Sequence, residues 1–214
     1  MTALTGKQVL RDFRTRSVLE STRRIIAAQG FDAVTMERVA AEAGITKGCI
    51  YLYFRNKDHL ILAALEEIAS EMIREVEGRI DSKAGPWGKV CQLVISQLET
   101  MERHKDVLRT ILLIRWLLND PRERKKWRRL LEYRQRHLKR IKAILDEGVR
   151  QKAFRRMDTG VAAFYINELA IGTAQKRMMG LSHAPLERDG RMLLRFLAPI
   201  LCGRMPIWKS GEGK

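Results

Sequence analysis

Apolar residues recur every three or four positions along nearly the whole chain, and no stretch alternates apolar and polar residues between hairpin turns. An early stripe consists of Val18, Thr22, Ile25 and Ile26. It is followed by Gly30, a residue type that commonly ends a helix. The sequence therefore predicts an all-α fold with about nine helices.

Capping residues and helix breakers predict where these helices begin and end. Thr35, Asn56 and Asp158 are placed to cap helix N-termini, and Pro121 suits a first helical position. After the helix that ends at Gly30, we expect helices over residues 36–43, 47–53, 57–80, 87–103, 106–118, 121–152, 159–179 and 186–202. Pro199 is expected to disturb the last turn of the final helix.

The charge of the chain favours an anionic partner. Lys and Arg number 41 against 25 Asp and Glu, which gives a formal net charge of +16, and 45% of the residues are hydrophobic. This composition is that of a globular protein, and its basic balance points to nucleic acid or acidic ligands. Most of the surplus lies beyond residue 60, so net charge alone does not locate a nucleic-acid site.

The cysteines and the longest apolar run indicate a soluble cytoplasmic protein. Cys49, Cys91 and Cys202 are odd in number and never form a Cys-x-x-Cys motif, so a reducing compartment is expected. No signal peptide opens the chain, and the densest apolar run, residues 111–118, is far shorter than the ~20 residues that span a bilayer. We therefore expect no contact with a membrane.

The motifs of common enzymes and metal sites are absent from the sequence. It contains no Gly-x-Ser-x-Gly motif, P-loop, dinucleotide fingerprint or paired carboxylates in one apolar site. His, Cys and Asp residues do not cluster at metal-ligand spacing. We expect neither catalysis nor a cofactor nor a bound metal.

Residues 35–57, TMERVAAEAGITKGCIYLYFRNK, fit a helix-turn-helix at each position. Ala40 is small where the two helices approach, Gly44 supplies the turn, and Ile45 and Ile50 fill the junction. The second of these helices is short and exposed, as a helix that enters a DNA groove must be.

Several residues of this segment suit contacts with DNA. Gly48 allows the backbone to approach the groove, Lys47 can reach a phosphate or a guanine edge, and hydroxyl groups can donate to phosphate oxygens. The candidate DNA contacts are Thr35, Thr46, Lys47, Gly48, Cys49, Tyr51, Tyr53 and Lys57. Taken singly, each has a structural alternative, because a threonine before a helix is often only an N-cap and a tyrosine at helical spacing is often half-buried packing.

This segment resembles the DNA-binding region of the TetR (tetracycline repressor) family. The resemblance rests on a Thr, an Ala-Ala-x-x-Gly step and Lys-Gly-x-x-Tyr-x-Tyr-Phe-x-x-Lys-x-x-Leu, and it covers residues 14–60. It implies a homodimeric transcriptional regulator, usually a repressor, that binds an inverted-repeat operator and is released by a small-molecule effector. Lys47 and Gly48 would then meet bases or adjacent phosphates. The backbone would be held by Thr35, Tyr51, Tyr53 and Lys57, whereas Cys49 and Leu52 depart from the commoner residues of the family.

The resemblance also predicts the domain organisation. We expect a DNA-binding domain over residues 8–56, a ligand-binding and dimerisation domain over 57–203 and a tail over 204–214. A different kind of protein, a basic nucleoid-binding protein without sequence preference, remains the alternative, and its binding would depend steeply on salt.

Residues 161–171 are apolar on nearly every face, which favours burial between two chains, with an internal core helix as the alternative. Within the family the last two helices form a four-helix bundle across the dimer axis. The candidate dimer-interface residues are Ala162, Phe164, Tyr165, Leu169, Leu193, Leu197 and Ile200.

A ligand pocket is predicted among the fifth to seventh helices. Amphipathic or soft side chains there suit a mostly apolar cavity, and the candidates are Trp87, Met101, His104, Arg115, Trp116, Tyr133 and His137. Arg115 lies within an apolar run and would bind an anionic ligand group or pair with Glu99 or Glu102. The effector is thus expected to be hydrophobic or anionic.

The basic stretch over residues 122–142 holds eleven Lys and Arg and two acidic residues. Such a run on one helix is normally a solvated face. A second contact with DNA or attraction of an anionic effector are the alternatives.

Overall fold

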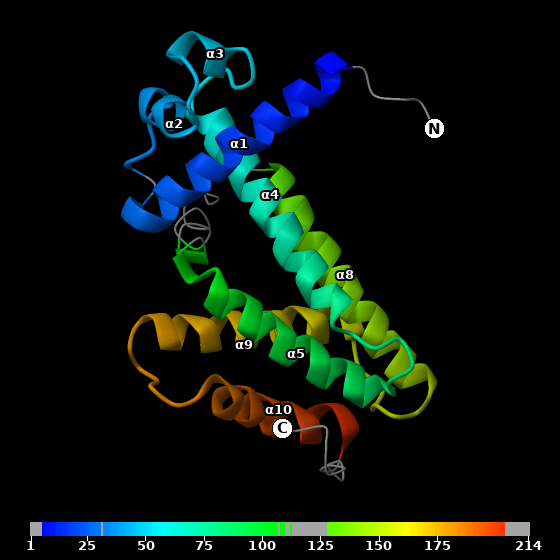
Figure 1. The fold of residues 1–214 in the computed structure, drawn as a ribbon. Coiled ribbons are helices and arrows are strands. Elements are labelled where there is room, and N and C mark those ends of the chain that lie inside the picture. The colour runs from blue at the N-terminus through cyan, green and yellow to red at the C-terminus, as the bar shows by residue number, and fades with distance from the viewer. Residues whose placement is uncertain (1–5, 31, 107, 110–111, 113–127, 204–214) are drawn as a thin grey trace. The chain divides into compact units, whose positions relative to one another are not determined.

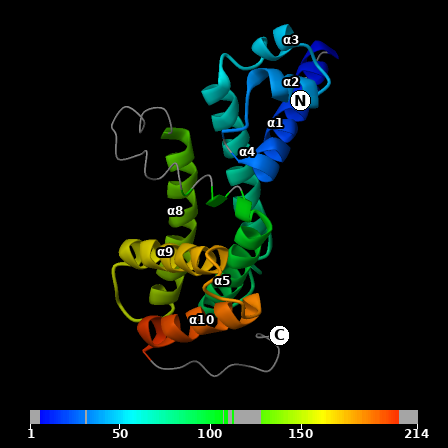
Figure 2. The same cartoon turned by 90° about the vertical axis from the view of Figure 1, so that its left-hand side faces the viewer.

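The computed structural model describes residues 6–30, 32–106, 108–109, 112 and 128–203. These residues form eight α-helices and no strand, which confirms the predicted all-α class (Figures 1 and 2). The chain divides into two compact units, one of residues 1–70 with 106–131 and one of residues 71–105 with 132–214. The predicted domain limits stay predictions, and the tail over 204–214 and most of the helix predicted over 106–118 lie outside the described residues.

The first unit contains α1 (Gly6–Gln29), α2 (Met36–Glu42), α3 (Lys47–Tyr51) and the beginning of α4 (Lys57–Gly78). Helix α2 packs against both α1 and α3. The core of this unit is mostly apolar, and its buried residues include Val18, Thr22, Ile25, Ile26, Val39, Ile50 and Leu60. The stripe predicted for the first helix is therefore its buried face.

The second unit contains the end of α4, α5 (Pro86–Arg103), most of α8 (Arg128–Arg150), α9 (Thr159–Met178) and α10 (Leu186–Cys202). Helix α5 packs against both α9 and α10, and α9 also packs against α10. The central core residues are Val76, Leu93, Val94, Leu98, Ile141, Leu145, Phe154, Ile166, Ala170, Leu194 and Leu201. Burial of such side chains is the main stabilising contribution to this unit.

Most predicted helix ends are confirmed by cap geometry. Gly30 follows α1 with a φ of 81°, and the Asp158 carboxylate caps α9 by accepting from the backbone N–H groups of Gly160 and Val161 at 2.9 and 3.0 Å. Pro86 begins α5 at a position where its missing N–H costs nothing. Local chemistry thus determines these ends.

The differences from the predicted ends are small. Helix α8 stops at Arg150, just before Lys152, whose φ of 56° is left-handed and cannot continue a helix. Helix α10 continues through Pro199 to Cys202, so the expected disturbance of its last turn is not observed. Gly203 then ends it with a φ of 77° and donates to the Pro199 carbonyl at 3.1 Å.

Candidate nucleic-acid interface and ligand site

Thr35 caps the start of α2, and Gly44 and Thr46 lie in the turn between α2 and α3. Thr35 Oγ1 accepts from the backbone N–H of Arg38 at 3.1 Å, and Thr46 Oγ1 accepts from that of Cys49 at 3.2 Å. Gly44 has a φ of 67°, the left-handed conformation that the turn requires. Both threonines are therefore N-caps, and because the cap bond uses only the oxygen, each hydroxyl hydrogen can still donate to a phosphate.

The outer face of α3 is exposed and carries the predicted contact residues. Ile50 points inward and is fully buried, whereas Lys47, Gly48 and Tyr51 are exposed. A Cβ added to Gly48 would meet no atom within 4 Å, so no neighbour in the described structure requires a glycine there. A small residue at this position is useful only to something that approaches from outside, as a groove would.

Lys47 is charged but engaged within the chain. Its ammonium forms an ion pair with the carboxylate of Glu37 on α2. The hydrogen bond with Lys47 lowers the pKa of Glu37, and the same bond raises the pKa of Lys47. Both side chains are exposed, so DNA can compete for this ammonium at modest cost.

The remaining predicted contacts are only half exposed. Lys57 Nζ donates to the Asp32 carbonyl at 3.3 Å, which ties the start of α4 to the loop before α2. Cys49 and Tyr53 are also half-buried. These residues combine a structural role with any contact to DNA.

Arg14 of α1 is a candidate that the sequence analysis did not single out. Its Nη1 donates to Cys49 Sγ at 3.9 Å, and a hydrogen bond with Tyr53 raises the pKa of the guanidinium. It adds a second cation beside α3. Only its place at the start of the TetR-like region could have pointed to it.

The second unit contains the described part of the predicted pocket. Met101 of α5 and His104, which caps the end of α5, are buried, Trp87 is packed against the core, and Tyr133 and His137 of α8 are half-buried. Arg115 and Trp116 lie outside the described residues. The two acidic partners considered for Arg115 already have cations beside them.

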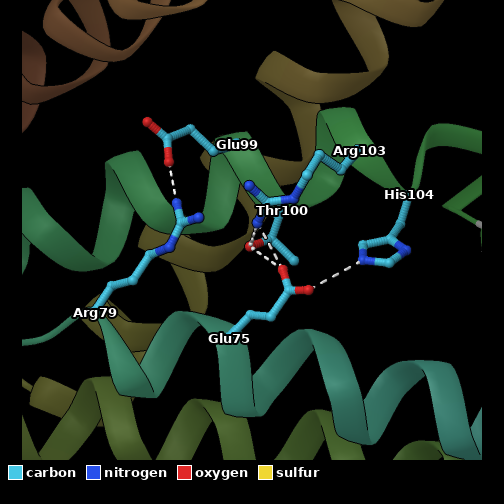
Figure 3. A network of polar contacts seen from close by, with 6 residues as sticks. All are labelled: Glu75, Arg79, Glu99, Thr100, Arg103 and His104. Atoms are coloured by element: carbon cyan, nitrogen blue, oxygen red, sulfur yellow. Dashed lines mark hydrogen bonds and ion pairs between the residues drawn. The ribbon is translucent and has the colours of Figure 1, made fainter.

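A polar network joins α4 to α5 (Figure 3). Glu75 accepts from Arg103 at 2.6 Å and from Thr100 at 3.2 Å, and its other oxygen lies 3.6 Å from His104 Nε2. Burial raises the pKa of Glu75, but the hydrogen bonds from Arg103 and His104 outweigh it and hold the pKa below its usual value. His104 thus lies against a carboxylate as a satisfied polar residue.

The acids named as alternatives for Arg115 belong to other pairs. Glu99 pairs with Arg79 (Figure 3), and Glu102 pairs with Arg177 at 3.2 Å. Arg177 also donates to Asp189 at 2.8 Å and to the Ala184 carbonyl at 2.7 Å, which links α9 to the start of α10.

A second polar group lies inside this unit and is called the central polar group here. It consists of Gln97 of α5, Arg134 and His137 of α8, and Asn167 and Glu168 of α9. Of these five, only His137 was predicted as a pocket residue.

The candidate dimer residues fall into two sets. Phe164, Tyr165 and Ile200 are exposed large apolar side chains. Leu193 and Leu197 are only 8% and 3% exposed because they pack into the core of their own unit, and Ala162 and Leu169 are half-buried against it. The exposed apolar residues of α9, α10 and the loop between them that were not predicted are Val161, Met179, Leu181, Met192 and Phe196.

Neither a metal-binding cluster nor a membrane-spanning helix is present among the described residues. No group of three or more His, Cys, Asp or Glu in the described part of the chain is placed to hold a metal ion. None of the helices seen there is long and apolar enough to cross a membrane.

The comparisons with known proteins agree with the helix-turn-helix geometry. Residues 18–64 match the family described as bacterial regulatory proteins, tetR family. The uncharacterized HTH-type transcriptional regulator YerO of Bacillus subtilis is 30% identical over 97 residues, which are 44% of this chain and 34% of YerO. The HTH-type transcriptional repressor AcnR of Corynebacterium glutamicum is 28% identical over 145 residues, which are 68% of this chain and 66% of AcnR.

The fold has solved counterparts. The transcriptional regulator FadR of Bacillus subtilis, solved in complex with stearoyl-CoA, superposes with a TM-score of 0.73 at 21% identity over 86% of this chain and 98% of that one. The chain spans less than two thirds of the length of the curated relatives YerO and AcnR.

The capped turn and the exposed α3 form a helix-turn-helix, the DNA-binding element of many transcription regulators. More narrowly, residues 18–64 are those of the tetR family of bacterial regulatory proteins.

Proposed function

We propose that this protein is a ligand-responsive repressor that binds an inverted-repeat operator as a homodimer and leaves it when a small-molecule effector binds. The observation that carries the proposal is the outer face of α3, where Lys47, Gly48 and Tyr51 are exposed around a buried Ile50. This arrangement offers a cation, a hydroxyl and a close backbone approach to one DNA groove.

The exposed apolar side chains of α9 and α10 support a dimer. Phe164, Tyr165, Phe196 and Ile200 are at least 41% exposed, and a soluble chain rarely leaves so many large apolar residues in water. A second copy of the same surface would cover them and would set the distance between two copies of α3. An operator with two-fold symmetry follows from this arrangement.

The effector is assigned to the second unit. The polar groups inside its apolar core supply the few fixed contacts that orient a small molecule. An effector that prefers the conformation with the weaker affinity for DNA lowers DNA binding by some factor. Bound DNA then lowers the affinity of the protein for the effector by the same factor.

The test begins with selection of bound DNA from a random pool, followed by gel-shift titration of the selected site. We expect a selected inverted repeat, and we expect Lys47→Ala and Tyr51→Ala each to weaken binding about tenfold or more. Lys83→Ala is the matched control because it also removes one exposed cation, but from the loop before α5, and it should leave the affinity unchanged.

The same sample measured by native mass spectrometry reports the oligomeric state and any co-purified ligand. Binding of all sequences alike, with a steep salt dependence, would instead identify a nucleoid-type protein and would overturn the proposal. Unchanged affinity of the α3 variants would overturn the assignment of those residues.

A further inference from the structure

Four of the five residues of the central polar group are linked by hydrogen bonds between three helices. Gln97 Nε2 donates to Asn167 Oδ1 at 3.0 Å, and Asn167 Nδ2 donates to Glu168 Oε1 at 3.1 Å. Arg134 Nη2 donates to the same carboxylate oxygen at 2.7 Å. Gln97 and Asn167 are each only 3% exposed, whereas the side chains of Arg134 and Glu168 are 35% and 26% exposed, so this chain of polar contacts leads from the apolar core towards the surface.

The carboxylate determines how the two amides are oriented. A carboxylate only accepts, so the NH2 of Asn167 must face Glu168, and the Asn167 oxygen must then face Gln97. The NH2 of Gln97 has to donate to that oxygen, which turns the Gln97 oxygen away from the group. The atom that Gln97 presents elsewhere is therefore an acceptor.

Four buried atoms of the group have no hydrogen-bond partner among the residues that the structure describes. They are Gln97 Oε1, Arg134 Nε and both ring nitrogens of His137. An unsatisfied buried polar atom is destabilising, and native domains contain only a few per hundred residues. Gln97 and Arg134 belong to one hydrogen-bonded chain, and His137 lies one turn of α8 beyond Arg134, so these unsatisfied atoms indicate that something outside the described residues completes them.

His137 follows Arg134 by three residues on α8, so the two side chains lie on the same face of this helix. Burial lowers the pKa of His137 to about 4, and the ring is neutral at pH 7. A neutral imidazole offers one donor and one acceptor. The free atoms of the whole group are thus two acceptors and two donors.

The net charge of the group decides what it can bind. The Arg134 cation is paired with the Glu168 carboxylate and His137 is neutral, so the five residues of the group carry no net charge. A ligand carboxylate would be repelled by Glu168, and a ligand ammonium would be repelled by Arg134. Because Arg134 and Glu168 are already paired with each other, neither ligand charge would gain a counter-ion of its own, and binding of a charged ligand is unfavourable. The neighbours of Gln97 along the buried side of α5, Val94 and Met101, are apolar.

We infer that the central polar group binds the uncharged polar end of a small molecule, an amide or an alcohol, whose remaining part is apolar. This rests on the effector role proposed above and narrows the effector class from hydrophobic or anionic to neutral with one donor-acceptor group. Gln97 accepts from the ligand, and Arg134 and His137 donate to it.

The test uses the full chain and four probes that share a six-carbon skeleton: hexanamide, 1-hexanol, hexanoate and hexylammonium. Isothermal titration should show the two neutral probes binding at least tenfold more tightly than either charged probe. Gln97→Met conserves volume but removes the acceptor, and it should weaken hexanamide at least fivefold. Gln135→Met makes the same change at an exposed site of α8 and should have no effect.

A second measurement does not depend on the folding of a variant. In the unaltered protein, hexanamide should shift the NMR signals of the His137 ring and leave those of the exposed His183 in place. Equal affinity for all four probes, or no saturable binding of hexanamide, would show that water alone satisfies these atoms and would overturn the inference.

The operator gel shift separates this inference from the proposed function. If hexanamide binds at His137 and operator affinity does not change, the site stands and the effector-release proposal fails. If no DNA is bound in any condition, the regulator proposal fails while the titration with the four probes still decides the nature of the site.

Discussion

The helix-turn-helix segment and the second unit use polar side chains in opposite ways. In the first, α2 and α3 have seven and five residues, and their polar residues Lys47, Tyr51 and Glu37 point into solvent. In the second, helices of 17 to 23 residues enclose Gln97, Asn167 and Asp189. Exposed groups are satisfied by water until a partner arrives, whereas buried groups must be satisfied within the fold or by a bound molecule.

This difference predicts where substitutions act. Substitutions of the exposed polar residues of α2 and α3 should alter binding to DNA. They should leave the free energy of unfolding almost unchanged, because surface groups contribute little to stability. Substitutions of the buried polar residues of the second unit should mainly lower the free energy of unfolding. Three measurements test this contrast, and the largest effect is expected for the buried ion pair between α9 and α10.

Asp189→Ala should destabilise the protein by about 4 kcal/mol. Arg177 and Asp189 are both largely buried, and the substitution leaves the guanidinium without the carboxylate that it contacts at 2.8 Å. Ser182, which also donates to Asp189, loses its acceptor. Urea unfolding followed by circular dichroism measures the change.

Glu187→Ala is the control, since it removes an exposed carboxylate two residues earlier on α10. It should change the free energy of unfolding by less than about 0.5 kcal/mol. Equal losses in the two variants would show that burial does not distinguish these sites, and the contrast between the units would fail.

The stability of the second unit should also depend on pH through His137. Burial lowers the pKa of His137 from 6.5 to about 4, so between these values the unfolded chain binds a proton that the folded chain does not. The free energy of unfolding is therefore highest above pH 6.5, where His137 is neutral in both states, and it decreases as the pH falls from 6.5 to about 4. A shift of this size corresponds to about 3 kcal/mol.

His137→Gln should flatten the dependence of the unfolding free energy on pH across this window. His183→Gln, at an exposed histidine, should leave the wild-type profile unchanged. If the profiles of wild type and His137→Gln are parallel between pH 6.5 and 4, His137 takes up its proton as readily in the folded chain as in the unfolded one.

The sequence predicted those features that depend on local chemistry. Thr35, Gly44 and Asp158 are caps or turn residues whose effect reaches only a few positions along the chain, and the structure confirms each. The helix-turn-helix is predictable for the same reason, because its spacing is contained in one short window.

Features that depend on tertiary packing were not predictable in this way. Gln97 and Asn167 are 70 residues apart, and nothing in either helix alone indicates that they pair. Helical spacing placed Leu193 and Leu197 on an apolar face, but it does not show whether that face meets its own chain or a second one. Both leucines pack into the core of their own unit, whereas their neighbour Phe196 is exposed on the outer side of α10.

The smallest effect is expected for the exposed ion pair between Lys47 and Glu37 in the first unit. Here a substitution should change binding to DNA without changing stability. Glu37→Gln removes the carboxylate that holds the Lys47 ammonium and keeps the shape of the side chain. The freed cation becomes available to a phosphate, so affinity for non-operator DNA should rise a few-fold. The slope of log affinity against log salt should become steeper by about 0.9, the value for one additional phosphate contact.

Glu42→Gln provides the matched control, because Glu42 lies on the same short helix but pairs with Arg24 of α1 at 3.1 Å. It should leave the salt slope unchanged, and neither variant should move the thermal unfolding midpoint. Salt titrations on one random-sequence duplex measure both. An equal change of slope in the two variants would mean that DNA responds only to the net charge of α2. A change confined to Glu37→Gln would mean that the Glu37 carboxylate weakens binding to DNA that lacks the operator. The reason is that the Lys47 ammonium must leave its ion pair with Glu37 before it can contact a phosphate.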